Sequence, residues 1–73
     1  MMESKKKKIN KLAGYRTMLG MNQTEMGTIL GISKQAYSRK ETGKISFKDS
    51  EKILIKELLL LYFPEVTMED LFF

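Results

Sequence analysis

The sequence predicts a single all-α domain of five short helices. Apolar residues recur at intervals of three and four in several stretches, as they do along one face of a helix. The glycines at positions 20, 31 and 43 each follow such a stretch and are suited to ending a helix. With 73 residues, the chain has room for one domain and a small core.

The first helix is expected over residues 9–19. Its apolar face comprises Ile9, Leu12, Ala13 and Leu19. Arg16 lies on the same side, and for this residue alone an exposed surface charge is the simplest role. Gly20 then ends the helix, and Asn22 is suited to cap the helix that follows.

A second helix is expected over residues 23–30, and Gly31 ends it in the left-handed conformation that glycine adopts without strain. Its apolar face comprises Met26, Ile29 and Leu30. Gly27 lies on the buried side, where the lack of a side chain lets a neighbouring helix backbone come close. The substitution of glycine for alanine in a helix costs roughly 1 kcal/mol in propensity. Ile32 follows the turn and points toward the core.

A third helix is expected over residues 34–42, opened by Ser33 as N-cap and closed by Gly43. Ala36 and Tyr37 point inward by their helical spacing. The other face is polar and comprises Lys34, Gln35, Ser38 and Arg39. Such side chains are also ordinary on a solvated helix surface, so this face alone does not decide between a surface and a binding role.

The fourth helix is expected over residues 47–63, ahead of the helix-breaking Pro64. Its apolar stripe is expected to comprise Ile53, Leu54, Leu58, Leu61 and Tyr62. Ile55, Leu59 and Leu60 add apolar residues on the remaining sides, so the end of this helix is apolar almost all round. A helix of this kind requires cover on more than one side. In so small a chain, a second copy of the chain is the expected source of that cover.

A fifth, short helix is expected to follow Thr67 as its cap and to run through Leu71, with Glu69 and Asp70 in its first turn. Phe72 and Phe73 follow, and left in water they would form an apolar patch. Either they fold back onto the core of the domain or they contact a second copy, and the sequence leaves both open.

The stretch from Gln23 to Lys44 resembles the Cro and phage-repressor type of helix-turn-helix family, the XRE-type regulators. The residues that carry the resemblance are Gln23, Gly27, Leu30-Gly31-Ile32-Ser33, Tyr37-Ser38-Arg39 and Glu41-Thr42-Gly43-Lys44. The chain departs from the family at Lys40, where an aliphatic residue is usual. A lysine stem at this position can cover apolar surface while its ammonium reaches water.

The resemblance implies a lambda-repressor-like fold whose third helix enters the major groove of double-stranded DNA. The implied base contacts are Lys34, Gln35, Ser38 and Arg39. The implied phosphate contacts are Asn22, Gln23, Thr42 and Lys44. A structural ion pair between Arg16 and Glu41 is also implied. Capping remains an alternative role for Asn22, and a solvated turn for Thr42 and Lys44.

For function, the resemblance implies a cytoplasmic transcriptional regulator that binds specific DNA sequences and represses by operator occupancy, as in Cro-like phage or prophage switches. A homodimer on a roughly palindromic operator is expected, with half-sites about one DNA turn apart. The expected dimer contacts are Leu58, Leu59, Tyr62, Leu71, Phe72 and Phe73. The alternative is a protein-interaction module, such as an antitoxin-like protein that sequesters a partner through its apolar C-terminal surface.

Charge is unevenly distributed along the chain. Residues 1–48 carry 11 Lys or Arg and 3 Asp or Glu, a net +8, whereas residues 49–73 carry 2 and 6, a net −4, and together they give the +4 of the whole chain. The basic half is suited to attracting polyanions, and the acidic half is expected to face away from DNA. Residues 1–8 include four consecutive lysines and are expected to form a flexible arm ahead of a domain at 9–73. This arm is either a solvated tail or a segment that lies on the phosphate backbone or in a minor groove.

Composition argues against catalysis and metal binding. The chain has no cysteine and no histidine, which excludes disulfides, ordinary zinc sites, thiol nucleophiles and the commonest general base. It contains no glycine-rich phosphate loop, and no cofactor or small-molecule substrate is expected. The longest apolar run, residues 58–63, is far shorter than the roughly 20 residues of a membrane helix, and the first residues lack the apolar stretch of a secretory signal. The protein is therefore expected to be neither an enzyme nor membrane-bound.

Overall fold

The computed structural model describes residues 11–72, and every regular element within that range is an α-helix. The helices are α1 (Leu12–Met18), α2 (Gln23–Leu30), α3 (Lys34–Glu41), α4 (Asp49–Leu60) and α5 (Met68–Phe72). The prediction of a five-helix all-α fold is therefore confirmed for this part of the chain. Residues 1–10, which include the predicted arm, and residue 73 lie outside the described residues. None of the described helices is both long and apolar enough to cross a membrane.

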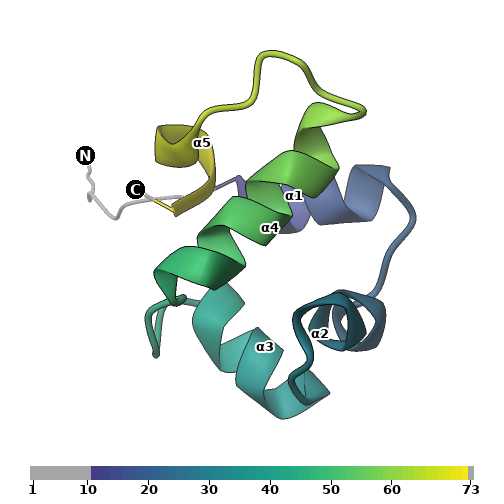
Figure 1. Cartoon of the computed structure of the whole chain (residues 1–73). Helices are drawn as coiled ribbons and strands as arrows, with labels where there is room; N and C mark the ends of the chain where they lie inside the picture. The colour runs from purple at the N-terminus through teal and green to yellow at the C-terminus, as the bar shows by residue number, and fades with distance from the viewer. Residues whose placement is uncertain (1–10, 73) are drawn as a thin grey trace, which may run out of the picture.

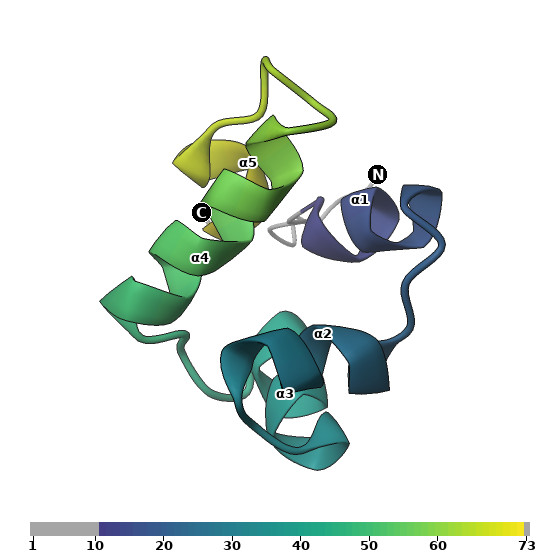
Figure 2. The same cartoon turned by 45° about the vertical axis from the view of Figure 1, so that its right-hand side comes forward.

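The helices form two groups (Figures 1 and 2). Helices α2 and α3, here called the α2–α3 unit, pack against each other at one end of the molecule, in the most extensive contact between any two helices of residues 11–72. Helices α1, α4 and α5 form the other group, in which α5 contacts both α4 and α1. The backbone N–H of Lys11 donates to the carbonyl of Asp70 at 2.9 Å and ties the start of α1 to α5. The α2–α3 unit is thus held against a support of three helices.

Hydrogen bonds at the helix starts confirm the predicted caps of α2 and α3. The side chain of Asn22 accepts from the backbone N–H of Glu25 at 2.8 Å, and the Glu25 carboxylate accepts from the N–H of Asn22 at 2.9 Å. Ser33 likewise accepts from the N–H of Ala36 at 3.0 Å. These bonds satisfy N–H groups that have no partner within the helix. The starts of both helices are therefore fixed by residues close by in the sequence.

The turn between α2 and α3 depends on two glycines. Gly31 has a φ of 75°, in the left-handed region that disfavours side chains. Gly27 is buried, and a Cβ there would lie 2.8 Å from the carbonyl oxygen of Ile32 and 3.2 Å from that of Ser33. The N–H of Ile32 also donates to the Gly27 carbonyl at 2.8 Å. The backbone that comes close to Gly27 is therefore that of the turn, and not that of a neighbouring helix as predicted.

The predicted bounds of the helices differ from those observed mainly in α1 and α4. Helix α1 begins at Leu12, and α4 is shorter than the predicted 47–63 at both ends. Lys48 is extended and forms the N-cap of α4, where its N–H donates to the Glu51 carboxylate at 2.8 Å. The helix stops at Leu60, and the N–H of Phe63 still donates to the carbonyl of Leu59 at 2.7 Å. Pro64 has no N–H for the next bond, to Leu60, so the proline ends this pattern, as predicted.

One core joins the two groups of helices. Its buried hydrophobic side chains are Leu12, Met26, Tyr37, Phe47, Ile55, Leu59, Val66 and Leu71. Each of the helices α1 to α5 supplies at least one of them, and the loops before and after α4 supply Phe47 and Val66. The α2–α3 unit is therefore packed into the same core as its support.

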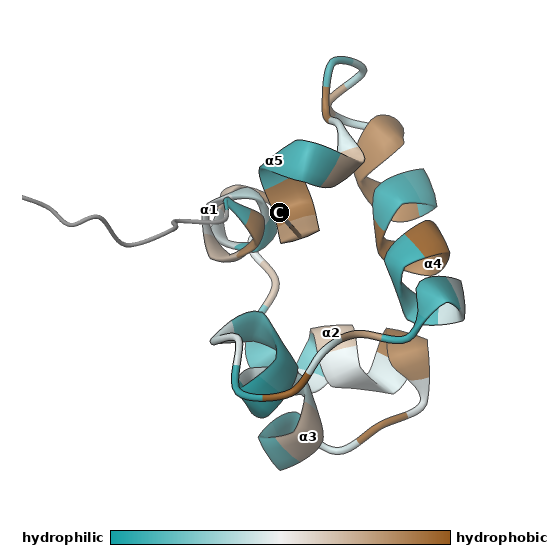
Figure 3. Cartoon of the chain, turned by 90° about the vertical axis from the view of Figure 1, so that its left-hand side faces the viewer, coloured by the Kyte–Doolittle hydropathy of each residue, from teal (hydrophilic) through white to brown (hydrophobic). Residues whose placement is uncertain are grey.

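The prediction of which face of α4 is buried is wrong. Ile55 and Leu59 are fully buried, and with Glu51 they form one row at intervals of four residues. Most of the residues predicted to face inward are instead 45% to 76% exposed, namely Ile53, Leu54, Leu61 and Tyr62. Leu58 is partly buried against the core. Figure 3 shows brown segments along α4, and because apolar residues occur on so many of its sides, their spacing does not select the buried one.

Replacing Gly27 by alanine is expected to destabilise the fold. The new Cβ would meet backbone carbonyl oxygens of the turn, which cannot rotate away as the end of a side chain could. We expect the free energy of unfolding to fall by roughly 1–3 kcal/mol, the usual cost of overpacking, despite the better helix propensity of alanine. Urea unfolding followed by circular dichroism measures this change.

Gly14→Ala in α1 is the matched control for this substitution. Nothing lies within 4 Å of the Cβ that it adds, so the variant should gain up to about 1 kcal/mol from helix propensity. Glycine to alanine is thus expected to lower the free energy of unfolding at position 27 and to raise it at position 14. Equal effects at the two positions would contradict this account of the turn.

Candidate nucleic-acid interface

The polar face of α3 lies on the surface of the molecule. Lys34, Gln35 and Arg39 are exposed, and Ser38 is partly exposed. Together with Lys44 from the following loop, these side chains line one open hollow. The structure therefore brings together all four residues expected to meet base edges, and places one of the expected phosphate contacts beside them.

The opposite face of α3 anchors the helix in the core. Tyr37 is fully buried, and its ring packs edge-on against Phe47, with the ring centroids 5.9 Å apart. Ala36 is half-buried on the same side. Side chains on opposite faces of a helix keep a fixed angle to one another, so burying Tyr37 directs the polar face outward.

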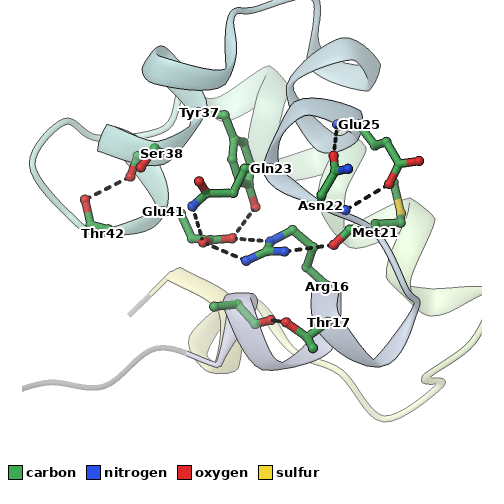
Figure 4. Close-up of polar contacts among 11 residues, drawn as sticks. Arg16, Thr17, Met21, Asn22, Gln23, Glu25, Tyr37, Ser38, Glu41 and Thr42 are labelled. Atoms are coloured by element: carbon green, nitrogen blue, oxygen red, sulfur yellow. Dashed lines mark hydrogen bonds and ion pairs between the residues drawn. The ribbon is translucent and has the colours of Figure 1, made fainter.

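A buried carboxylate ties α3 to α1 and α2 (Figure 4). The Glu41 side chain is 5% exposed, and the Arg16 guanidinium reaches it with 2.8 Å from Nε to Oε2 and 3.2 Å from Nη2 to Oε1. The Tyr37 hydroxyl donates to Oε2 at 2.7 Å, and the Gln23 amide donates to Oε1 at 3.0 Å. Arg16 also donates from Nη1 to the carbonyl of Met21 at 2.8 Å. Arg16 and Glu41, the pair that the resemblance implies, thus lie in contact within a larger network.

This network keeps its carboxylate charged. Burial by itself raises the pKa of Glu41, because the charged form loses its hydration. The hydrogen bonds from Arg16, Tyr37 and Gln23 act in the other direction and prevail, so the pKa of Glu41 lies below its ordinary value. Burial, together with the hydrogen bond to Glu41, raises the pKa of Tyr37, which therefore remains a donor. The hydrogen bond to Glu41 likewise raises the pKa of Arg16.

The residues expected to contact phosphates are not placed alike. Lys44 is exposed and lines the hollow on α3. The amide of Gln23 instead donates one of its two hydrogens to Glu41. The hydroxyl of Thr42 donates its one hydrogen to the carbonyl of Ser38 at 2.8 Å, so Thr42 already uses the polar hydrogen that a phosphate would need. Asn22 is exposed at the start of α2, where its side-chain oxygen forms the cap.

The residues expected to form the dimer contact are also divided. Those fully buried in the core are Leu59 and Leu71. Leu59 of α4 and Leu71 of α5 both face the core of their own chain in this fold. Leu58 and Phe72 are partly buried against that core, so folding back, which the sequence left open, holds for Phe72. Tyr62 is 60% exposed, and Phe73 lies outside the described residues.

A second buried ion pair, absent from the expectations based on sequence, joins α3 to α4. The Lys40 ammonium lies 2.7 Å and 2.9 Å from the two carboxylate oxygens of Glu51, and the side chains are 10% and 7% exposed. The expectation that this ammonium reaches water is therefore wrong. Burial raises the pKa of Glu51, but the hydrogen bonds from Lys40 and from the Lys48 N–H prevail and leave that pKa below its ordinary value. The signals in the sequence were a charge where an aliphatic residue is usual and an acidic residue opening the next helix.

Glu41→Gln is expected to lower the free energy of unfolding by about 3 kcal/mol at neutral pH, because Arg16 loses its buried counter-charge. The folded-state pKa of Glu41 is depressed, so the stability that the carboxylate contributes is present above its ordinary pKa of 4.5 and is lost as the pH falls through the folded-state value. The difference between wild type and variant should therefore shrink as the solution is acidified below pH 4.5. Urea unfolding at a series of pH values measures it.

Tyr37→Phe is the matched control for this experiment. It removes one hydrogen bond to the carboxylate but keeps the ring and the charge, and should cost about 1 kcal/mol. Its stability should still fall on acidification, as in wild type. If the effect of Glu41→Gln were the same at every pH, the carboxylate would not be the charged centre of this network.

Comparison with known proteins agrees with this geometry. Residues 5–54 match the protein family described as the antitoxin Xre-like helix-turn-helix domain. No curated protein and no solved structure gave a significant match. The matched segment spans more than half of the chain and includes α1, α2, α3, both buried ion pairs and the polar face of α3. The chain therefore belongs to the Xre-like helix-turn-helix family of DNA-binding domains.

Proposed function

We propose that this protein binds double-stranded DNA at specific sequences and thereby regulates transcription. The proposal depends on one observation: Lys34, Gln35, Ser38 and Arg39 line a single open hollow on the exposed face of α3. Their chemistry suits the edges of bases, since arginine and lysine donate to guanine, glutamine pairs with adenine, and serine bonds to several bases. Membership of the Xre-like family supports the same conclusion.

In the proposed complex, α3 lies in the major groove and α2 crosses the sugar–phosphate backbone. Lys44 and Asn22 would bond to phosphates and set the register, joined by Gln23 and Thr42 if their side chains turn outward. The buried network around Glu41 holds α3 in position before DNA arrives, so that less conformational freedom is lost on binding.

The proposed regulator acts as a homodimer on a roughly palindromic operator, with half-sites about one DNA turn apart. It represses by occupying its site in the cytoplasm, as a Cro-like phage or prophage repressor does. A dimer is supported by the exposed apolar side of α4 and its C-terminal end, here called the α4 outer face. This face comprises Ile53, Leu54, Leu61 and Tyr62, each at least 45% exposed. Exposed apolar surface of this kind is typical of interaction sites.

Arg39→Ala is expected to weaken binding to the preferred operator by about 1–3 kcal/mol, the value of one good contact to a base, while the melting temperature is unchanged. Arg39 is exposed on the outer side of α3, so its truncation leaves the core intact. The operator is first selected from a random DNA pool, and fluorescence anisotropy then compares it with a scrambled duplex.

Lys11→Ala is the control for loss of positive charge, because Lys11 is exposed at the start of α1, outside the α3 hollow. It should leave the ratio of affinities for operator and scrambled DNA unchanged. If Arg39→Ala also left the ratio of affinities for operator and scrambled DNA unchanged, Arg39 would not take part in base recognition.

Leu61→Glu is expected to convert the dimer into a monomer without unfolding it, because Leu61 is 76% exposed on the α4 outer face. Analytical ultracentrifugation measures the change. Met18→Glu is the matched control, since Met18 is 65% exposed on α1 and lies outside the α4 outer face. A wild-type protein that sediments only as a monomer, with and without operator DNA, would eliminate the dimer.

A second candidate function is the sequestration of a partner protein by an antitoxin-like mechanism. Two observations favour it: the matched family is described as antitoxin Xre-like, and the α4 outer face is apolar and exposed. The two functions respond differently to the same variants. Sequestration predicts that Arg39→Ala has no effect and that Leu61→Glu or substitutions at Phe72 abolish capture of the partner, whereas DNA binding predicts loss of operator recognition in Arg39→Ala.

A further inference from the structure

We infer that the buried Lys40–Glu51 pair sets the angle between the α2–α3 unit and α4, and that this angle determines which spacing of DNA half-sites the dimer recognises. Lys40 and Glu51 would be positioning residues, because neither lines the hollow on α3. The inference rests on the proposed function, in which two copies pair through the α4 outer face and each inserts α3 into DNA.

The pair lies where the two groups of helices are joined. Helix α3 packs most extensively on α2, and its contact with α4 is much smaller. Lys40 belongs to the last turn of α3 and Glu51 to the first turn of α4, where these two ends approach each other (Figure 1). The same junction also holds an aromatic contact, between the rings of Tyr37 in α3 and Phe47 in the loop before α4. An ion pair made of two short hydrogen bonds is more directional than such a contact.

Both ends of the pair are fixed within their own helices. The Oε1 atom of Glu51 also accepts from the backbone N–H of Lys48 at 2.8 Å, so the carboxylate is attached to the start of α4. Lys40 directly precedes Glu41, which is bound to α1 through Arg16. The ammonium is therefore presented from a helix that is itself held in place. A lysine side chain is flexible in water, but here it is 10% exposed and bound to both carboxylate oxygens.

The length of α4 turns a small change of angle into a large displacement. Its 12 residues span about 18 Å, with Glu51 near one end and Leu61 just beyond the other. A rotation of about 10° at the junction would move the far end by about 3 Å. That distance is comparable to the rise of about 3.4 Å per base pair of DNA. In a twofold dimer both protomers contribute, so the separation of the two α3 helices would change by a base-pair step or more.

The test compares wild type with the double variant Lys40→Met/Glu51→Gln. Removing both charges together leaves no unpaired charge in the interior, and glutamine keeps an oxygen for the Lys48 N–H. Each protein is titrated with a single half-site and with paired half-sites whose spacing changes in steps of one base pair. We expect the affinity of the variant for a single half-site to stay within about two-fold of the wild-type value. The ratio of the affinity at the best spacing to that at the other spacings is expected to fall by about ten-fold.

Lys11→Met/Asp70→Asn is the matched control. It removes the ion pair between Lys11 and Asp70, which joins α1 to α5 at 3.7 Å and is far more exposed. This variant should keep the spacing preference of wild type. If Lys40→Met/Glu51→Gln also keeps it, the pair only stabilises the fold and the inference is overturned, while the proposed function stands.

A second variant keeps the test decisive if the first one unfolds. Lys40→Arg retains the charge pair but changes the length and donor geometry of the cation. It should keep the melting temperature and move the best spacing, and an unmoved optimum would overturn the inference. The proposed function, and the inference with it, would instead be refuted if the wild-type protein showed no sequence-specific binding. The same holds if a second half-site did not raise its affinity for DNA.

Discussion

The carboxylate of Glu41 is the group on which the arrangement of this small domain depends. It is almost fully buried and accepts hydrogen bonds from Arg16 of α1, Gln23 of α2 and Tyr37 of α3. A buried charge is costly unless its partners remain in place. If α3 moved away from α1, the charge would lose Arg16, and if α3 moved away from α2, it would lose Gln23. The helix that carries the exposed polar face is therefore held by a polar constraint, in a chain too short for a large core.

Two consecutive residues at the end of α3 attach it in opposite directions. Glu41 is bound to α1 and α2, and Lys40 is bound to α4 through Glu51. The two pairs also have opposite polarity on α3, so this helix buries one negative and one positive side chain. Their neighbour Arg39, one position earlier, points to the surface. Helical geometry thus separates a side that fixes the angle of α3 from a side that is free to meet another molecule.

What could be predicted from the sequence is what depends on residues close by in the chain. The ends of α2 and α3 follow from Asn22, Ser33 and Gly31, whose hydrogen bonds or backbone angle act within three or four residues. The outward polar face of α3 follows in the same way. The buried side of α4 could not be predicted, because apolar residues occur on both sides and tertiary packing makes the choice. The Lys40–Glu51 pair could not be predicted either, because two charges eleven positions apart meet only at one particular angle between their helices.

The molecule presents two unlike surfaces at separate places on one rigid framework. The polar face of α3 suits a polyanion, whereas the α4 outer face is apolar and belongs to the acidic half of the sequence. Repulsion from DNA would keep that half on the side of the domain that faces away from the duplex. Because the ion pair between α3 and α4 joins the two surfaces, any molecule that binds the α4 outer face also determines where the attached α3 helix is presented. The two proposed functions would therefore use the same framework and would differ in what covers α4: a second copy of the chain for the proposed DNA-binding dimer, and another protein for the proposed sequestration.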